Sequence, residues 1–249
     1  LMDARGTGAS HLLQCDEIVS LGENADDSDD PAKLRVLTER CRDRLAKTSD
    51  LRFYATADHI RDLDLLRATI GVDRLNLAGI SYGTRVAQQY AARYPEHTRT
   101  VTLDSIAPNT LVLGQEHALN LDAAIKQQFA RCVADTACKR NIGDPAALLA
   151  KVRTALQAGG LAAVRYRDPT NGEWREEIPT FGHLGSLLRF YAYRPESASM
   201  LPLILHDAAD GRYETLLSQS RALSGDIGDS IALGMHLSVS CTEDPEIKP

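Results

Sequence analysis

Apolar positions in the first 110 residues alternate between helical and strand spacing. The pattern predicts helices over 32–47 and 84–94 and strands over 74–79 and 99–103. A further helix, which Thr56 or Asp58 can cap, is predicted to run as far as Ile70, where Gly71 ends it. This alternation of helices and strands predicts a parallel sheet covered by helices on both faces, which is the α/β class.

The pattern becomes mainly helical after Pro108. It predicts helical structure across 114–158 and helices over 183–193, 197–209 and 212–222. Residues 162–178 instead predict a β-hairpin, because two alternating runs flank the turn pair Asn171-Gly172. Residues 231–241 return to a strand-like alternation, in which His236 is expected to be buried. A mainly helical region is therefore inserted between two parts of the sheet.

The segment between the strand at 74–79 and the helix at 84–94 reads Gly79-Ile80-Ser81-Tyr82-Gly83. This pattern is typical of a nucleophile elbow, in which a serine lies on a sharp turn from strand to helix. Glycines on both sides of the serine let chain segments pass closely. Ser81 is expected to be exposed at the sheet edge, where N–H groups face a developing oxyanion. The motif predicts a serine hydrolase; the alternative is a tight turn whose serine only caps the helix.

Composition and charge narrow the class of protein. The 249 residues are enough for one large or two small domains with a sizeable core, and 43% of them are hydrophobic. The net charge of −6 argues against nucleic acid or an anionic membrane as the main partner. No apolar run has the length of a membrane span, so no membrane partner is expected. We also expect no cofactor.

Five cysteines bear on the redox compartment. Cys132 and Cys138 bound a short loop that a disulfide could close, and Cys15 and Cys41 could form a second bridge. Cys241 is left over, which is typical of a partner outside the chain or of a buried free thiol. A metal site is not expected, because no histidine or second cysteine pair lies near Cys132. Disulfides would indicate an oxidising compartment, and reduced core cysteines are the alternative.

Several motifs taken together resemble a known family. They are Asp3-x-Arg5-Gly6-Thr7-Gly8-x-Ser10, Cys15, Gly79-Ile80-Ser81-Tyr82-Gly83-Thr84, Tyr90, Tyr94-Pro95, Leu103-Asp104, Cys132…Cys138 and Cys241-x-Glu243-Asp244. This combination resembles secreted α/β-hydrolase aminopeptidases, the proline iminopeptidase and tripeptidyl aminopeptidase group. The resemblance implies an α/β-hydrolase sheet with an inserted, mainly helical cap. It also implies a secreted or periplasmic enzyme that cleaves N-terminal residues or short peptides with a Ser-Asp-His triad.

The change of pattern after Pro108 predicts how the chain is divided. We expect residues 1–110 to form part of the hydrolase core, 111–231 the cap, and 232–249 a return to the core. The upstream His-Gly-Gly-Pro-Gly segment of the family, its downstream Asp and His and a further late cysteine are not found in this sequence. Residues 1–6 read as the end of a strand that runs into a loop. We therefore expect a chain truncated at both ends, with the family partner of Cys241 in the missing remainder.

Ser81 is the expected nucleophile, and the backbone N–H of Tyr82 is the expected oxyanion donor. Asp104 ends the strand after the elbow, where some α/β-hydrolases place their acid, but it is expected instead to order the turn that follows. None of the histidines is favoured as the catalytic base: His11, His59, His97, His117, His183, His206 and His236. The catalytic acid and base are therefore expected outside this chain.

Glu243 and Asp244 are candidates for binding the ammonium group of a substrate, because buried carboxylates bind such a group well. In the related iminopeptidases, acids from the cap region bind the amino end of the substrate. The alternative is a solvated acidic turn before Pro245. Arg5 is expected to tie loops together. The substrate is then a peptide, or a small ester if the chain is a carboxylesterase or lipase on the same fold. A catalytically incomplete fragment is the third possibility.

Overall fold

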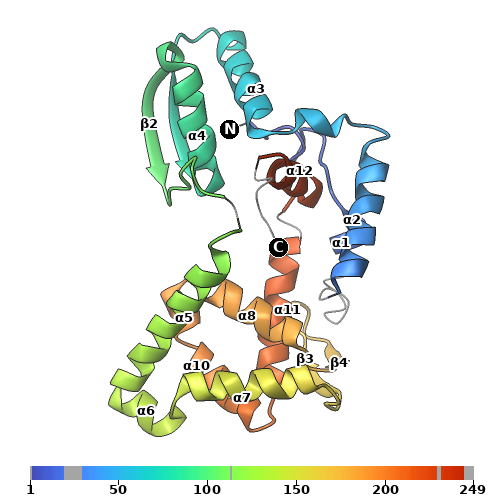
Figure 1. Ribbon diagram of the computed structural model, residues 1–249, viewed down its shortest axis with the longest axis vertical. Helices are drawn as coiled ribbons and strands as arrows, with labels where there is room; N and C mark the ends of the chain where they lie inside the picture. Colours follow the sequence, from blue (N-terminus) through green and yellow to red (C-terminus); the bar gives the residue numbers. More distant parts are fainter. Residues whose placement is uncertain (1, 20–29, 113, 229–230, 244–249) are drawn as a thin grey trace. The chain divides into compact units, whose positions relative to one another are not determined.

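The computed structural model describes residues 2–19, 30–112, 114–228 and 231–243 (Figure 1). The chain divides into two compact units. The first consists of Leu1–Cys15, Arg40–Gln115 and Ala232–Pro249, and the second of Asp16–Glu39 and Glu116–Ile231. Helix α2 (Pro31–Leu45) contributes residues to both units. The expected division into a hydrolase core and a cap stays a prediction, since compactness alone does not reveal the role of either unit.

Two parallel strands, β1 (Leu75–Ile80) and β2 (Thr98–Asp104), form the sheet of the first unit, with Leu77 opposite Val101 and Ile80 opposite Asp104. Helices α3 (Thr56–Thr69) and α4 (Tyr82–Arg93) share a core with this sheet. Its buried members are Ile60, Leu77, Val86, Ala87 and Tyr90. Figure 1 shows α4 alongside the two strands. The predicted order of helix, strand, helix and strand is therefore confirmed.

Only one face of this sheet is covered among the described residues. Leu77 and Gly79 are buried, whereas the alternate positions Ala78 and Ile80 are exposed, Ile80 to 69%. The prediction that helices cover both faces is wrong for the described chain, because α3 and α4 both pack on the Leu77 face.

The N-terminal residues form turns instead of the predicted end of a strand. Gly6 and Gly8 have positive φ angles of 81° and 47°, and the Thr7 N–H donates to the Ala4 carbonyl at 2.9 Å. The Asp3 carboxylate accepts from the Ala9 N–H at 2.9 Å, which closes a further bend. Leu1 lies outside the described residues. The strand prediction is wrong for residues 2–6 because these bonds bend the backbone away from an extended path.

Arg5 lies in this N-terminal loop and binds α3. Its Nε and Nη2 donate to the two carboxylate oxygens of Asp62 at 2.6 and 2.5 Å, and its Nη1 donates to the Phe53 carbonyl at 2.6 Å. This bidentate contact fixes both the position and the angle of the guanidinium. The expectation that Arg5 ties loops together is confirmed.

Helix α12 (Leu233–Glu243) occupies the segment for which a strand was predicted over 231–241. That prediction is wrong because the buried positions Gly234, Met235 and Val239 have helical spacing. His236 is exposed on this helix, not buried in a strand. Gly234 donates its N–H to the Leu13 carbonyl at 2.9 Å, and a Cβ at Gly234 would lie 2.8 Å from that oxygen. The close approach of α12 to the N-terminal loop therefore requires glycine.

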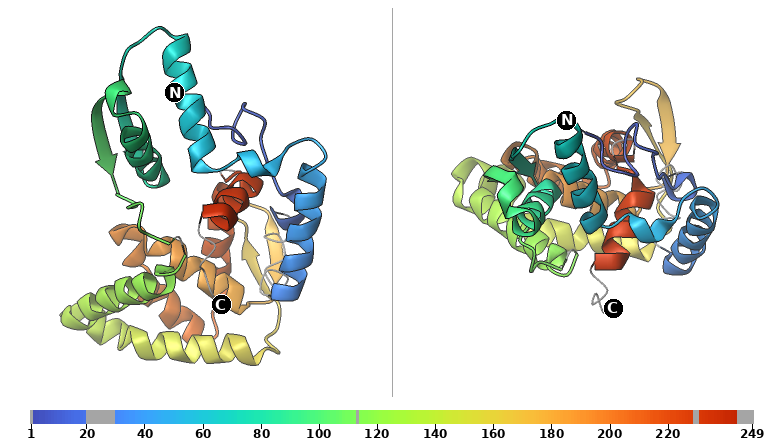
Figure 2. Two further views of the ribbon diagram at one scale, coloured as in Figure 1. Left: turned by 45° about the horizontal axis from the view of Figure 1, so that its top comes forward. Right: turned by 90° about the horizontal axis from the view of Figure 1, so that it is seen from above.

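The second unit is mainly helical, as predicted for residues 114–158 and for the segments after 181. Its longer helices are α5 (His117–Ala134), α6 (Thr136–Ile142), α7 (Pro145–Ala158), α8 (Phe181–Tyr191), α10 (Leu201–Ala209) and α11 (Glu214–Gly228). The single helix predicted over 197–209 is instead two, α9 (Pro195–Ala198) and α10, and Pro202 lies at the start of the second. In Figures 1 and 2, α7, α8, α10 and α11 pack together around their shared core.

The predicted hairpin is also confirmed in the second unit. Strands β3 (Val164–Arg167) and β4 (Trp174–Glu177) pair antiparallel, with Val164 opposite Glu177. Gly172, from the predicted turn pair, has a φ of 76° that favours glycine.

Among the described residues, no helix of either unit combines the length and apolar character needed to cross a membrane.

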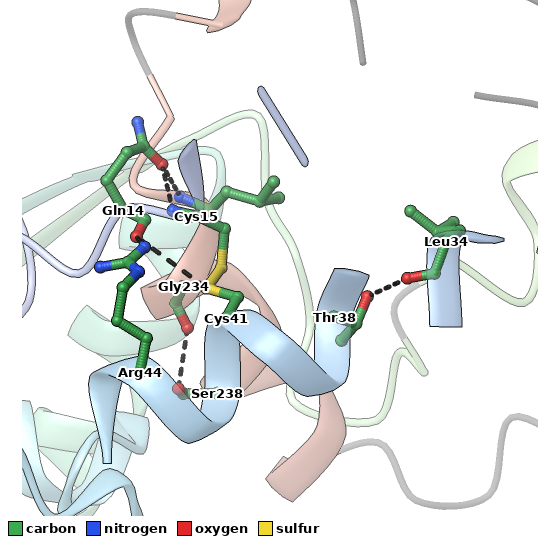
Figure 3. The surroundings of a disulfide bond; sticks show 9 residues. Gln14, Cys15, Leu34, Thr38, Cys41, Arg44, Gly234 and Ser238 are labelled. Carbon is green, nitrogen blue, oxygen red and sulfur yellow. Dashed lines mark hydrogen bonds between the residues drawn. A yellow bond between two sulfur atoms is a disulfide. The ribbon is translucent and has the colours of Figure 1, made fainter. Parts of the chain in front are cut away.

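Two disulfides link the cysteine pairs that the sequence indicated. Cys15 bonds to Cys41 in the first unit, and Cys132 bonds to Cys138 at the end of α5. Figure 3 shows the first bridge beside α12, where Gly234 and Ser238 lie close to Cys41. Cys41 and Arg44 of α2 both contact the Gln14 carbonyl, so the bridge and the helix hold the same turn of the N-terminal loop. Cys241 is free and exposed, which excludes the buried thiol.

We expect loss of the Cys15–Cys41 bridge to destabilise the protein more than loss of Cys132–Cys138. The bridged residues are 26 positions apart in the first case and 6 in the second. A disulfide lowers the entropy of the unfolded chain, and it does so by a larger amount when the loop that it closes is longer. The two losses of stability should therefore differ by about 1 kcal/mol. Urea unfolding of the C15A/C41A and C132A/C138A double variants measures this difference. An equal or larger loss for the short loop would contradict it.

Candidate active site

Ser81 is the residue at which strand β1 ends and helix α4 begins. Its φ of 53° and ψ of −122° lie in a region that non-glycine residues adopt only where the surrounding structure enforces it. Ser81 is exposed, and its Oγ makes no hydrogen bond with any described residue. The predicted sharp turn from strand to helix at an exposed serine is confirmed. The role of that serine as nucleophile stays a prediction.

Gly79 makes the turn possible through a close backbone contact. A Cβ at Gly79 would lie 2.3 Å from the Gly83 carbonyl oxygen and 2.8 Å from the Thr84 Cα. No real side chain tolerates such distances, so α4 can start directly above β1 only because residue 79 is glycine. Gly83 differs, since a Cβ there would meet no atom within 4 Å among the described residues. The expectation that both glycines allow close passage therefore holds for Gly79 and fails for Gly83.

Thr84 fixes the turn from the helix side, a role that the sequence reasoning missed. It is fully buried, and its N–H and Oγ1 both donate to the Ser81 carbonyl, at 2.9 and 2.6 Å. The same Oγ1 accepts from the Ala107 N–H at 2.8 Å, and Gln88 Nε2 donates to the Thr84 and Ala107 carbonyls. These bonds connect the elbow to the loop after β2. The sequence did offer a signal for this contact, because a threonine three residues after Ser81 can donate its hydroxyl to the Ser81 carbonyl.

The first turn of α4 supplies backbone N–H groups next to Ser81. Tyr82 and Gly83 are the first two residues of the helix, and no carbonyl inside an α-helix can accept from its first N–H groups. The positive end of the helix dipole lies at the same place. The Ser81 N–H itself is used, since it donates to the Asp104 carbonyl at 3.0 Å across the sheet. The Tyr82 N–H is therefore available to an oxyanion, and its role as the oxyanion donor stays a prediction.

The Tyr82 side chain belongs to a buried polar cluster with Thr56 and Glu243. Its hydroxyl shares a short hydrogen bond with Thr56 Oγ1. Burial raises the pKa of Tyr82, and the nearby charge of Glu243 raises it further, although the hydrogen bond with Thr56 opposes this shift. The tyrosine therefore stays protonated at neutral pH and donates or accepts as a neutral hydroxyl.

Glu243, at the end of α12, is the acidic member of this cluster. Its Oε1 accepts from the Thr56 N–H at 2.5 Å, and its Oε2 lies 3.9 Å from Nη1 of Arg85 on α4. The Glu243 side chain is 17% exposed, whereas that of Arg85 is 3% exposed. The structure thus brings Glu243 next to the helix that begins at Ser81. Asp244 lies outside the described residues.

The candidate acid Asp104 lies at the end of β2, next to the elbow. Its carbonyl accepts from Ser81, while its carboxylate accepts from Ser105 Oγ at 3.1 Å. Ser105 has a φ of 58°, so the chain turns sharply directly after the strand. The carboxylate therefore orders the following turn, which confirms the expectation for this residue.

The first unit contains four of the seven histidines, His11, His59, His97 and His236. His97 Nδ1 lies 2.7 Å from Asp64 Oδ1, beyond the C-terminal end of α4, whose 12 residues are about 18 Å long. His11 contacts Ser49, and burial lowers the pKa of His59, which lies near Asp62. His236 is exposed on α12. No hydrogen bond joins Ser81 to a histidine within the described ranges. The three remaining histidines, His117, His183 and His206, belong to the second unit.

Comparison with known proteins agrees with this geometry. The family described as alpha/beta hydrolase fold matches residues 1–199. The serine protease Hip1 of Mycobacterium tuberculosis is 35% identical over 107 residues, which are 43% of this chain and 20% of that protein. The tripeptidyl aminopeptidase of Streptomyces lividans is 30% identical over 138 residues, covering 51% of this chain and 25% of that protein. The chain thus spans about a quarter or less of these relatives. It belongs to the alpha/beta hydrolase fold family.

Proposed function

We propose that this chain carries the nucleophile of a serine hydrolase, and that the enzyme is an exopeptidase that removes N-terminal residues or short peptides. The observation that carries the proposal is the exposed Ser81 at a φ of 53° between β1 and α4. A serine in this position of an alpha/beta hydrolase presents its hydroxyl above a helix N-terminus. Relatives named as a serine protease and a tripeptidyl aminopeptidase support the peptidase class.

In the proposed reaction, Ser81 Oγ forms a bond to the carbonyl carbon of the substrate, and its proton passes to a catalytic base. The Tyr82 N–H donates to the resulting oxyanion, a contribution of about 3 kcal/mol for one such donor. The carbon–nitrogen bond then breaks as the base returns the proton to the leaving amine. Water then attacks the acyl carbon while the base takes its proton, and the bond to Ser81 Oγ breaks as the base returns that proton to the serine, releasing the acid product.

We propose that the base and its acid partner come from outside this chain, because no histidine among the described residues forms a hydrogen bond with Ser81. If so, the isolated 249-residue chain reacts with a fluorophosphonate about a hundredfold more slowly than the full gene product, since general base catalysis is absent. The rate of adduct formation measures this directly. Equal rates would mean that the base lies within these residues.

The substrate class is tested by a pair of substrates that differ in the scissile bond. The full gene product should hydrolyse unblocked aminoacyl or tripeptidyl arylamides and should fail on their N-acetylated forms, because an exopeptidase requires the free amino end. Efficient hydrolysis of simple acyl esters together with no action on any arylamide would assign the carboxylesterase alternative instead. Either result leaves the serine chemistry at Ser81 intact and decides only the substrate.

We propose that Glu243 binds the substrate ammonium group, with Asp244 as the second candidate. Its carboxylate is partly exposed and lies in the cluster beside α4. Glu243→Gln should raise KM for an unblocked arylamide about tenfold, because a charge-assisted hydrogen bond is lost. Hydrolysis of an ester without an amino group is the internal control and should be unaffected. An equal loss on both substrates would show that Glu243 acts only by holding Arg85 and Thr56.

A secreted or periplasmic location is part of the proposal. Two disulfides are typical of proteins that fold in an oxidising compartment. The proposed partner is a peptide substrate, and the net charge of −6 gives no reason to add nucleic acid or an anionic membrane surface.

A further inference from the structure

A pocket of about 210 Å³ lies within the second unit, between the start of α5 and the end of α8. Its polar lining consists of His117, Asn120, Arg189 and Tyr193. The volume is below that of pockets for drug-sized ligands, which run from about 300 Å³ upward. The pocket therefore suits a ligand about as large as a single amino acid.

The polar side chains of this pocket form a set of hydrogen-bond donors without a carboxylate. Arg189 and Asn120 donate, the Tyr193 hydroxyl can donate, and the His117 imidazole has at least one N–H. None of the lining residues is Asp or Glu. Arg189 makes no ion pair with any described residue, so its fixed positive charge is not neutralised by the described part of the protein. An anionic group is the complement of this set.

The remaining walls are apolar, since Leu121, Ala124 and Ala192 complete the lining. A ligand that fits must therefore carry an apolar body next to its negative charge. The Tyr193 side chain is 71% exposed, and its ring stacks on Phe190 with centroids 6.4 Å apart. The Arg189 guanidinium also lies over the Phe190 ring, 6.0 Å from its centroid. Phe190 thus contacts two of the polar side chains of the pocket.

His117 is the first residue of α5, an 18-residue helix, so the positive end of its dipole lies at this side of the pocket. This field favours an anion in addition to Arg189. The planar guanidinium binds a carboxylate through two parallel hydrogen bonds, which matches a carboxylate better than a spherical anion.

We propose that this pocket of the second unit binds a small carboxylate with an apolar body, of the chemical class of an N-blocked amino acid or a short peptide end. The site is independent of the proposed chemistry at Ser81. Its ligand is recognised by Arg189 at the carboxylate and by Leu121 and the two alanines at the body.

The test uses N-acetyl-leucine and N-acetyl-leucinamide as probes and follows amide chemical shifts of the full chain by NMR. N-acetyl-leucine should bind saturably and shift residues at the start of α5 and the end of α8. The neutral amide should bind at least about tenfold more weakly than N-acetyl-leucine, since it lacks the charge that pairs with Arg189.

Arg189→Gln should weaken N-acetyl-leucine binding at least about tenfold, and Arg153→Gln, an exposed arginine on α7, is the matched control that should leave it unchanged. Ala124→Leu fills the pocket, keeps Arg189 and should also abolish binding. Equal binding of acid and amide would overturn the proposal. So would unchanged affinity in the Arg189 variant, shifts confined to other elements, or no saturable binding.

Discussion

Ser81→Ala should lower kcat/KM of the full gene product by about a thousandfold or more, because the covalent route through the acyl-enzyme is lost. The fold should persist. Ser81 is exposed and its Oγ bonds to no described residue, so removing the hydroxyl breaks no internal contact. The free energy of unfolding should then change by no more than about 0.5 kcal/mol. Hydrolysis of an unblocked arylamide and thermal unfolding measure the two effects.

Ser105→Ala is the matched control for this substitution. Ser105 is also an exposed serine with a positive φ, 58°, and it follows the neighbouring strand β2. Both variants place alanine at a position with positive φ, so a difference in activity reports the Ser81 hydroxyl and not the exchange of serine for alanine at such a position. Comparable activity in both variants would contradict a nucleophilic role for Ser81.

Gly79→Ala should destabilise the first unit by about 3 kcal/mol, because the new Cβ would overlap the Gly83 carbonyl. The two atoms would lie 2.3 Å apart, and the Gly83 carbonyl oxygen is a backbone atom, which cannot rotate away. Relief requires α4 to move from β1, and this movement also displaces Ser81. We therefore expect a lower unfolding temperature together with lost activity, measured by circular dichroism and arylamide hydrolysis.

Gly83→Ala provides the comparison within the same motif. A Cβ at Gly83 meets nothing within 4 Å in the described part of the chain, and residue 83 lies in the first turn of α4. Alanine is the better helix former by about 1 kcal/mol, so this variant should be as stable as the parent or slightly more so. If the two alanine variants were equally destabilised, the close contact at Gly79 would not be what shapes the elbow.

The elbow could be predicted from sequence because every feature it needs is local. A strand pattern, the Gly79-x-Ser81-x-Gly83 motif and a helix pattern follow one another directly within residues 74–94. The hairpin around Asn171-Gly172 was predicted for the same reason. The turn pair lies between two short alternating runs, and its glycine has the expected positive φ.

The segments that were predicted wrongly lack such local signals. Residues 231–241 alternate in hydrophobicity, but contact with Leu13 and Leu45 selects helical spacing with Gly234 at the contact. That contact joins residues more than half the chain apart, so no window of the sequence displays it. The prediction that helices cover both faces of the sheet was also wrong. An alternation of helices and strands along the sequence does not reveal which face of the sheet each helix covers.

The surroundings of Glu243 were equally beyond sequence reasoning. Its hydrogen-bond partner Thr56 is 187 residues away, and Arg85 had no assigned role. The fold brings them together through α3, α4 and α12, whereas the sequence shows only an acidic residue near Asp244. Contacts between residues so far apart in the sequence depend on how the helices pack, and the local pattern of residue types does not predict them.

We propose the hydroxyl at the β1–α4 turn as the reacting group of a serine hydrolase. Mass-spectrometric mapping of the fluorophosphonate adduct on the active full gene product tests it most directly. We expect one adduct, on the peptide that carries Ser81, with activity lost in proportion to labelling. Loss of activity with the adduct on a different serine, or full activity with Ser81 completely labelled, would contradict it.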